Sequence, residues 1–340
     1  MKAYIIPAGS SSIDDLRLIE RADPTPGPGQ LLIRVRAASL NYRDHAIAGG
    51  RYATGPVQHD TVPLSDGAGE VTAVGPGVTR FKLGDRVAGT FFQRSPDSLA
   101  VSPDVPPMAL GSPLDGMLRE QIVLFEDGVV EVPAGYSFEE AASLPCAAVT
   151  AWHALFRAGR SLVPGDSLLV LGTGGVSIFA LQFARMAGAH VIATSSSDEK
   201  LERAATLGAA ATINYLRTPE WDKEVLRLTG GRGVDCVVEV GGAGTLARSF
   251  QSVAPRGKVA LIGVLTGRAG DTTPYALMFK GAALHGIYVG DRSMFEEMNR
   301  AIEVNAVPPV IDRVFPFSDA AAAYRHQASG GFMGKIVIAI

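Results

Sequence analysis

A glycine-rich turn between two regular segments carries the clearest chemical information in this sequence. Residues 168–177 read LLVLGTGGVS, so an apolar run is followed by glycines and then by a segment with helical periodicity. Gly172 permits a sharp bend after a strand, and Gly174 lets the backbone approach a ligand with no Cβ in the way. The free N–H groups at the start of the helix favour an anionic ligand. This layout is typical of a turn that binds the pyrophosphate of a dinucleotide.

Contacts with that pyrophosphate are expected from one short segment. Its residues are Thr173, Gly174, Gly175, Val176 and Ser177. Ser177 stands where the usual G-x-G-x-x-G pattern has its third glycine, so the order of strand, turn and helix around it matters more than the pattern itself. Apolar residues then recur on one helical face, which predicts a helix over 176–187.

The end of the next apolar run, residues 190–194, is where such folds distinguish NAD from NADP. An acidic side chain there binds the adenosine ribose of NAD. This chain has hydroxyl groups and, one turn later, a lysine: Thr194, Ser195, Ser196, Ser197 and Lys200. Hydroxyls and a lysine suit a 2′-phosphate, which a carboxylate would repel. The sequence therefore predicts NADPH as the cofactor, although Ser197 can also be the N-cap of a helix over 198–207.

Two different patterns of secondary structure must position these residues. Short β-rich runs separated by glycine and proline, at 31–37, 69–74 and 86–88, predict an antiparallel, barrel-like domain. From residue 167 onward strands and helices alternate, which predicts an α/β domain with a doubly wound parallel sheet. The expected strands of that sheet are 168–171, 191–194, 211–213, 235–240, 258–262 and 284–288. The terminal GKIVIAI reads as a last strand that can return to the first domain.

Composition limits the classes of function. The 340 residues, 47% hydrophobic and 19% charged, suit two globular domains. A net charge of −3 gives no basic excess, so neither nucleic acid nor a membrane surface is an expected partner. No apolar run reaches the length of a membrane span, and we expect a soluble, cytoplasmic protein. The two cysteines, Cys146 and Cys236, are not expected to form a disulfide.

Several motifs in a fixed order extend this interpretation to the whole chain. They are SLNYRD (39–44), LSDGAGEV (64–71), GDRV (84–87), LPCAAVTAWHAL (144–155), GTGGVS (172–177), LGA (207–209), INY (213–215) and GKIVI (334–338). With them the chain resembles the medium-chain dehydrogenases/reductases, and specifically their zinc-independent, quinone-oxidoreductase-like branch. The resemblance implies a GroES-like catalytic domain over 1–140, completed by 308–340, and a Rossmann domain over 141–307. It also implies NADPH more often than NADH, and a cleft where the two domains meet.

The departures from zinc-dependent relatives bear on the chemistry. The catalytic zinc ligands of those relatives, a cysteine, a histidine–glutamate pair and a second cysteine, would fall near Asn41, Ser65 with Asp66, and Cys146, and of that set only Cys146 remains. The segment 92–116 contains five prolines and no cysteine, so the lobe that binds a structural zinc is also missing. We therefore expect no metal. The same segment is either a cover over the active site or a surface excursion.

The resemblance also implies residues for catalysis. It places Asn41 beside the nicotinamide, where its amide can orient the cofactor or donate to a substrate oxygen. Tyr52 matches a tyrosine that points into the cleft and could donate a proton. Asp44 and His45 lie next to them, and His45 is the only nearby group expected to titrate near neutral pH. Each also has a structural interpretation, since asparagine often closes a turn and Asp44 can hold the backbone.

Further cofactor contacts follow from the same resemblance. Thr150 matches a threonine near the nicotinamide, and Tyr215 matches the tyrosine at the adenosine phosphate. Other candidates lie at the ends of the fourth, fifth and last strands: Gly241, Gly263, Val264, Gly334 and Lys335. The carboxyl ends of parallel strands are where such sheets bind ligands.

These expectations lead to three hypotheses for function. The leading one is the reduction of a quinone, a conjugated enone or another small carbonyl compound by hydride from NADPH. The alternatives are a zinc-type alcohol dehydrogenase and a catalytically silent NADPH-binding sensor. Relatives pair the last strand of the Rossmann sheet between subunits, so a homodimer through residues 283–290 is expected.

Overall fold

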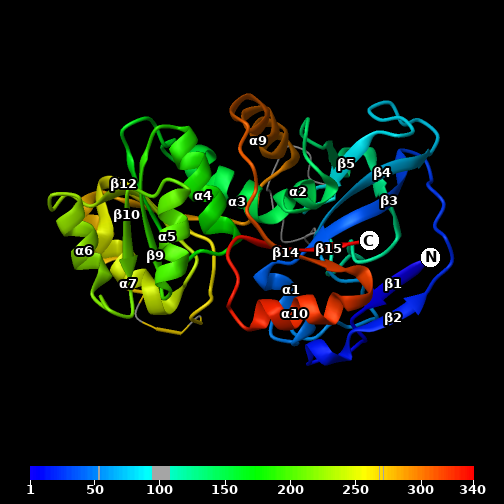
Figure 1. The fold of residues 1–340 in the computed structure, drawn as a ribbon, viewed down its shortest axis with the longest axis horizontal. Coiled ribbons are helices and arrows are strands. Elements are labelled where there is room, and N and C mark those ends of the chain that lie inside the picture. Colours follow the sequence, from blue (N-terminus) through cyan, green and yellow to red (C-terminus); the bar gives the residue numbers. More distant parts are fainter. Residues whose placement is uncertain (53, 94–107, 268, 271) are drawn as a thin grey trace. The chain divides into compact units, whose positions relative to one another are not determined.

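The computed structural model describes residues 1–52, 54–93, 108–267, 269–270 and 272–340 (Figure 1). It divides into two compact units, of which the first contains Met1–Val149 and Gly290–Ile340 and the second Thr150–Val289. The first unit is therefore built from both ends of the chain. In the described part of the chain, no helix has the length and apolar character that crossing a membrane requires.

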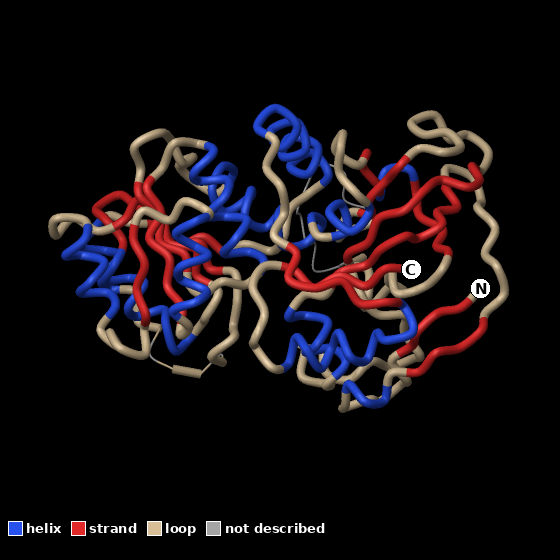
Figure 2. Tube along the Cα trace, in the orientation of Figure 1, coloured by secondary structure: helices blue, strands red, loops and turns tan. Residues whose placement is uncertain are grey.

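The second unit contains a six-stranded sheet with helices on either side of the strands (Figure 2). All its neighbouring strands are parallel, in the order β10-β9-β8-β11-β12-β13. The strands are β8 (Ser167–Val170), β9 (His190–Ser195), β10 (Ala211–Asn214), β11 (Val234–Glu239), β12 (Val253–Leu261) and β13 (Ala283–Gly286). This is the doubly wound order of dinucleotide-binding folds, and it confirms the α/β prediction.

The helices of the second unit follow the strands in turn. They are α4 (Gly175–Met186), α5 (Asp198–Thr206), α6 (Trp221–Leu228), α7 (Ala243–Ser252) and α8 (Tyr275–Lys280). A short helix, α3 (Val149–Trp152), leads into the unit. Trp221 and Phe250 pack with Leu169 and Val237 of the sheet in one apolar core.

The prediction for β12 was wrong at its start, which lies at Val253 rather than at residue 258. Pro255 and Gly257 are typical of a turn, but the chain passes through them inside the strand. Arg256 takes a left-handed φ of 61°, and the pairing with β11 shifts register between Val234 and Cys236. The segment is therefore a bulge, in which a turn-like sequence stays in the sheet.

The first unit contains a mostly antiparallel, β-rich sheet, as predicted. Its strand order is β14-β15-β3-β4-β5-β7, and β6 also pairs with β3. The strands are β3 (Gln30–Ser39), β4 (Asp66–Val74), β5 (Arg86–Gly89), β6 (Gln121–Phe125), β7 (Val129–Glu131), β14 (Ile311–Pro316) and β15 (Lys335–Ala339). A separate hairpin joins β1 (Lys2–Ile5) to β2 (Arg17–Glu20). The pair β14–β15 is parallel, so this sheet is not uniformly antiparallel.

The last strand returns to the first unit, as the sequence predicts. β15 lies beside β3 (Figure 1) and runs antiparallel to it. In this pairing Val337 lies opposite Ser39. The start of β15 therefore lies beside the residues that follow β3. That register places Lys335 next to Asn41, although the two are 294 residues apart in sequence.

Among the described residues, the first unit also contains four α-helices. They are α1 (Tyr42–Ala48), α2 (Phe138–Ala142), α9 (Arg292–Asn305) and α10 (Ala320–Ala328). Helix α9 follows the division at Gly290, whereas the expected boundaries place residues 290–307 in the Rossmann domain. Its Asn299 donates to the Glu131 carbonyl (3.0 Å), and Glu303 accepts the Ala134 N–H (2.8 Å). These contacts tie α9 to the β-rich unit.

Candidate functional site

The glycine turn after β8 has room for a ligand above its backbone. Gly172 adopts a left-handed φ of 71°, and Gly174 is the N-cap of α4 with no side-chain cap. A Cβ built at Gly174 would meet no atom within 4 Å. Packing within the protein therefore does not require glycine at this position, whereas close approach of a pyrophosphate does. Gly175 and Val176 begin α4, where unpaired N–H groups suit an anion.

Two hydroxyl groups of the predicted site hold this turn in place. The Ser177 hydroxyl donates to the Leu171 carbonyl (2.7 Å), and the Gly172 N–H donates to Thr194 Oγ1 (3.2 Å). Ser177 and Thr194 are buried, as is Thr173. The serine at the third-glycine position therefore closes the turn onto the end of β8.

The ends of β9 and β10 bring together the residues expected to select the cofactor. Ser195 lies opposite Asn214, and the Tyr215 N–H donates to the Ser195 carbonyl (3.1 Å). Ser195 is buried and Ser196 is exposed. Ser197 accepts the Lys200 N–H (3.3 Å), so the capping interpretation is confirmed. Capping does not conflict with a nearby phosphate, because it uses the Ser197 hydroxyl alone.

A second cation at this edge was missed in the sequence. Arg217 donates twice to Asp198, at 2.6 Å to each carboxylate oxygen, and Asn214 Nδ2 donates to the same carboxylate (2.8 Å). The hydrogen bond from Asn214, together with the charge of Arg217, lowers the pKa of Asp198. Arg217 follows Tyr215 by two residues, so the INYLR sequence contained the information.

A buried carboxylate organises the loop after β11. Glu239 Oε1 accepts the N–H groups of Gly241 (2.7 Å) and Gly242 (3.0 Å) and the Thr245 hydroxyl (2.6 Å). The Ser249 hydroxyl donates to its other oxygen. Glu239 is fully buried and was not identified from the sequence, because its partners all depend on the loop conformation.

Three of the predicted glycines are required by packing within their own unit. A Cβ at Gly241 would lie 2.2 Å from Thr245 Oγ1, and one at Gly263 would lie 2.2 Å from the Val240 carbonyl oxygen. At Gly334 it would lie 2.2 Å from the Val310 carbonyl oxygen. Their contacts with a cofactor stay predictions. Of the remaining candidates, Val264 is 38% exposed and Thr150 is buried.

In the first unit, Lys335 lies at the centre of a buried polar cluster. We use "Lys335 cluster" for five residues: Asn41, Ser65, Asp66, Cys146 and Lys335. The Lys335 ammonium donates to the Leu40 carbonyl (2.8 Å) and to Asn41 Oδ1 (2.6 Å), and it lies 3.5 Å from Asp66 Oδ2. An ammonium has three hydrogens to donate, and each has an acceptor here. The expected contact of Lys335 with the cofactor stays a prediction.

Asp66 joins the other members of the Lys335 cluster. It is fully buried, and it accepts the Ser65 hydroxyl (2.7 Å) and the Cys146 N–H (3.1 Å). Asn41 Nδ2 lies 3.5 Å from Ser65 Oγ. Burial, and then the charge of Asp66, raises the pKa of the Cys146 thiol, so the sulfur is protonated at neutral pH.

This donor set does not fit a catalytic zinc ion. Zinc requires deprotonated ligands, and catalytic sites use three of them. The cluster offers two usual ligands, the Asp66 carboxylate and the Cys146 sulfur, beside an amide and a hydroxyl, and an ammonium already lies against the carboxylate. Throughout the described ranges, no three His, Cys, Asp or Glu side chains come together in a way that would hold a metal.

The remaining predicted catalytic residues follow Asn41 in the chain, and of these Asp44 contacts it. Asp44 is buried and accepts the Asn41 N–H (2.7 Å), and burial raises the pKa of Asp44 to about 6. Burial and the charge of Arg51 lower the pKa of His45. The expectation that His45 alone titrates near neutral pH was therefore wrong, since burial adds Asp44. Tyr52 is partly buried, with its ring 5.2 Å from the Arg43 guanidinium.

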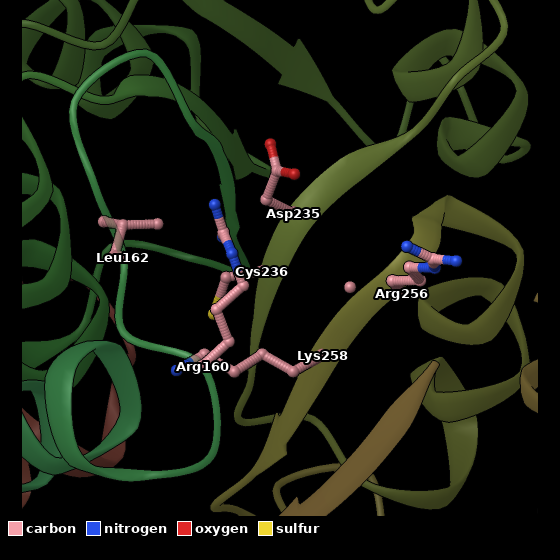
Figure 3. A pocket seen from close by; sticks show the side chains of 7 residues that line it. Arg160, Leu162, Asp235, Cys236, Arg256 and Lys258 are labelled. Atoms are coloured by element: carbon pink, nitrogen blue, oxygen red, sulfur yellow. The ribbon is translucent and has the colours of Figure 1, made fainter. Parts of the chain in front are cut away.

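A small pocket elsewhere in the second unit contains none of the predicted residues. Its lining includes Arg160, Asp235, Cys236 and Lys258 (Figure 3). Asp235 and Cys236 lie near the amino end of β11, whereas Glu239 lies at the carboxyl end. Ligands of doubly wound sheets bind at carboxyl ends, so this pocket is not the cofactor site.

The segment 92–116 was predicted to be either a cover over the active site or a surface excursion. Most of it, residues 94–107, lies outside the described residues, and so does this prediction.

The raised pKa of Asp44 leads to a prediction about stability. A carboxyl group with a pKa near 6 when folded and 3.8 when unfolded favours the folded state most at low pH, and this contribution is lost as the pH rises through 6. The shift of about two units corresponds to ~3 kcal/mol. Asp44→Asn should match the wild type in stability near pH 4 and exceed it by up to ~3 kcal/mol at pH 8, as measured by urea unfolding at each pH. A difference that is the same at both pH values would contradict this.

Comparison with known proteins places this geometry in context. The family model described as "Alcohol dehydrogenase GroES-like domain" matches residues 27–134, and "Zinc-binding dehydrogenase" matches residues 175–304. A zinc-type alcohol dehydrogenase-like protein of Schizosaccharomyces pombe is 44% identical over 99% of each chain. A quinone oxidoreductase of Pseudomonas aeruginosa is 32% identical over 92% of each chain.

Solved structures agree with the sequence comparison. A putative alcohol dehydrogenase from Sinorhizobium meliloti, 40% identical, superimposes with a TM-score of 0.90, and an NAD-dependent alcohol dehydrogenase, 33% identical, with 0.91; both matches cover each chain fully. A mycobacterial protein complexed with NADPH, 27% identical, also matches over the full length of both chains, with a TM-score of 0.84. The chain belongs to the medium-chain dehydrogenase/reductase family of oxidoreductases, whose members use nicotinamide cofactors.

Proposed function

We propose that this oxidoreductase reduces a conjugated enone, a quinone or another small carbonyl compound with NADPH and without a metal ion. The observation that carries the proposal is the Lys335 cluster. By resemblance to zinc-dependent relatives, it occupies the positions of their metal ligands, and its own ammonium supplies the positive charge. The open glycine turn at Gly174 fits the second requirement, a dinucleotide.

The chemistry needs a donor for a developing negative charge. NADPH, when bound, supplies a hydride and becomes NADP⁺. The β-carbon of an enone accepts that hydride, the carbonyl oxygen takes up the displaced electron pair, and one proton completes the saturated product. We assign Asn41 Nδ2–H to stabilise the oxygen and the Tyr52 phenol to donate the proton. A conjugated acceptor delocalises its charge, so a neutral hydrogen-bond donor can serve where a simple ketone would need a stronger Lewis acid.

The choice of NADPH rests on the edge formed by β9 and β10. Ser195 and Ser196 stand where an acidic residue would favour NAD, and Lys200 and Arg217 bring positive charge to the same edge. The Asp198 carboxylate is paired with Arg217 and Asn214, which reduces its repulsion of a phosphate. One structural neighbour is a complex with NADPH, whereas another carries an NAD-dependent name.

The proposed activity predicts turnover that does not depend on a metal. With NADPH, the purified enzyme should reduce quinones and enones faster than unconjugated ketones. Treatment with 1,10-phenanthroline followed by desalting should leave kcat unchanged within error, because the donor set does not hold zinc. Loss of activity that returns with added Zn²⁺, or turnover of unconjugated alcohols alone, would favour the zinc-type alcohol dehydrogenase instead.

The cofactor proposal predicts a selective loss of NADPH affinity. Removing one charged contact with a phosphate weakens binding by about 10- to 100-fold. Lys200→Ala and Arg217→Ala should each weaken NADPH binding by about that factor in a fluorescence titration and leave NADH binding nearly unchanged. The matched control is Lys223→Ala. Lys223 is an exposed lysine of α6 that is paired with Glu220, and its removal should change neither NADPH binding nor NADH binding. Equal loss for both dinucleotides would exclude recognition of the 2′-phosphate by these residues.

We also propose that the protein is a homodimer through β13. This strand ends the order of the six-stranded sheet, and its Leu284 is 40% exposed. Helix α8, just before it in the chain, exposes Tyr275 (68%), Met278 (65%) and Phe279 (85%). An unpaired strand edge beside exposed apolar side chains is suited to pairing with a second copy.

The homodimer proposal predicts a change of mass on charging the edge. In sedimentation at micromolar concentration, the wild type should form particles of twice the 35.6 kDa chain mass. Leu284→Lys should give a monomer, because a lysine on an edge strand opposes pairing. Val304→Lys places the same charge at an 84% exposed position of α9 and should leave the dimer intact. A wild type that sediments at 35.6 kDa would overturn the proposal.

A further inference from the structure

The hydrogen bonds of the Lys335 cluster fix the orientation of the Asn41 side-chain amide. An ammonium can only donate, so Asn41 must present its oxygen to Lys335 Nζ, at 2.6 Å. The Asn41 amide nitrogen is thereby turned away from the lysine. The orientation of a side-chain amide, which its shape alone leaves open, is fixed here by the charge of its neighbour.

Ser65 favours the same orientation of the Asn41 amide. Its one hydroxyl hydrogen is donated to Asp66 Oδ1 at 2.7 Å, so Ser65 Oγ faces Asn41 Nδ2 as an acceptor, at 3.5 Å. That contact uses one of the two Nδ2 hydrogens. The other has no acceptor within the portion of the chain that the structure describes. Asn41 is only partly buried, so its side chain is accessible to a ligand.

We propose that Lys335 is the positioning residue of this oxidoreductase: it orients and polarises the Asn41 amide so that Nδ2–H donates to the substrate oxygen. The inference rests on the proposed function and adds the origin of the stabilising charge. An amide whose oxygen accepts from a cation is a stronger N–H donor, because hydrogen bonds in a chain polarise one another. The proton stays on Lys335 throughout, and no bond to the lysine forms or breaks.

Because Asp66 and Lys335 are both buried, the test needs a double substitution. Asp66 is fully buried and Lys335 is 2% exposed, so Lys335→Met alone would leave a buried carboxylate without its cation and could unfold the unit. Lys335→Met combined with Asp66→Asn removes both charges. We call this double substitution the neutral-pair variant.

The kinetic test combines the neutral-pair variant with Asn41→Ala. If Lys335 acts through Asn41, the neutral pair should lower kcat for an enone by about 10- to 100-fold when Asn41 is present, and by less than about threefold in the Asn41→Ala background. The Kd for NADPH should not change in either background. Equal falls in both backgrounds are the result of a merely structural role and would overturn the proposal, as would no fall in the first.

A matched control is available in the second unit. Lys258 is 4% exposed, and its ammonium donates to the carbonyls of Leu155 (3.0 Å) and Ala158 (2.7 Å), beside the pocket of Figure 3. Lys258→Met removes an equally buried cation far from Asn41 in sequence. It should lower the melting temperature and keep kcat within about threefold of the wild type. A loss of kcat as large as that of the neutral pair would show that burial of a lysine, and not its contact with Asn41, carries the effect.

A second readout separates this inference from the proposed activity. The Asn41 side-chain amide pair can be assigned in ¹H–¹⁵N NMR spectra by its absence in Asn41→Ala. In the neutral-pair variant the two amide protons should shift and exchange faster with solvent. Unchanged amide signals would overturn the inference even if enones are reduced, whereas shifted signals with no turnover of any carbonyl compound would overturn the proposed function alone.

Discussion

The contact between the Lys335 ammonium and the Asn41 and Asp66 oxygens is the interaction on which the first unit depends. A buried carboxylate that loses its cation costs about 3–5 kcal/mol, a large part of the stability of a domain. The lysine comes from β15, and its position follows from the register of β15 against β3. The two ends of the chain must therefore meet before the Lys335 cluster can form.

The second unit buries a carboxylate in another way. Glu239 has four hydrogen-bond donors and, among the residues that the structure describes, no cationic partner, and it fixes the loop after β11. The glycine turn after β8 instead leaves open space above Gly174. One turn at the carboxyl edge of the sheet is thus closed by the protein itself, and its neighbour is left for a ligand. This division of roles follows from which N–H groups already have an internal partner.

Local patterns were predictable from the sequence, and long-range partners were not. The parallel strands, the helix after the glycine turn and the capping role of Ser197 all follow from residues close in sequence. The contact of Lys335 with Asn41 could not be deduced from local sequence, because the two residues are 294 apart in the chain. The raised pKa of Asp44 depends on complete burial, and the bulge at Arg256 depends on the neighbouring strand, so neither could be deduced from local composition.

We propose that a lysine of the chain supplies the positive charge for which zinc-dependent relatives use the metal. The most direct test is a crystal structure with NADP⁺ and an unreactive enone analogue, with anomalous diffraction recorded on both sides of the zinc absorption edge. We expect no anomalous peak at the Lys335 cluster and a substrate oxygen within hydrogen-bonding distance of Asn41 Nδ2. A zinc peak held by Asp66 and Cys146, with the Lys335 ammonium displaced, would contradict it.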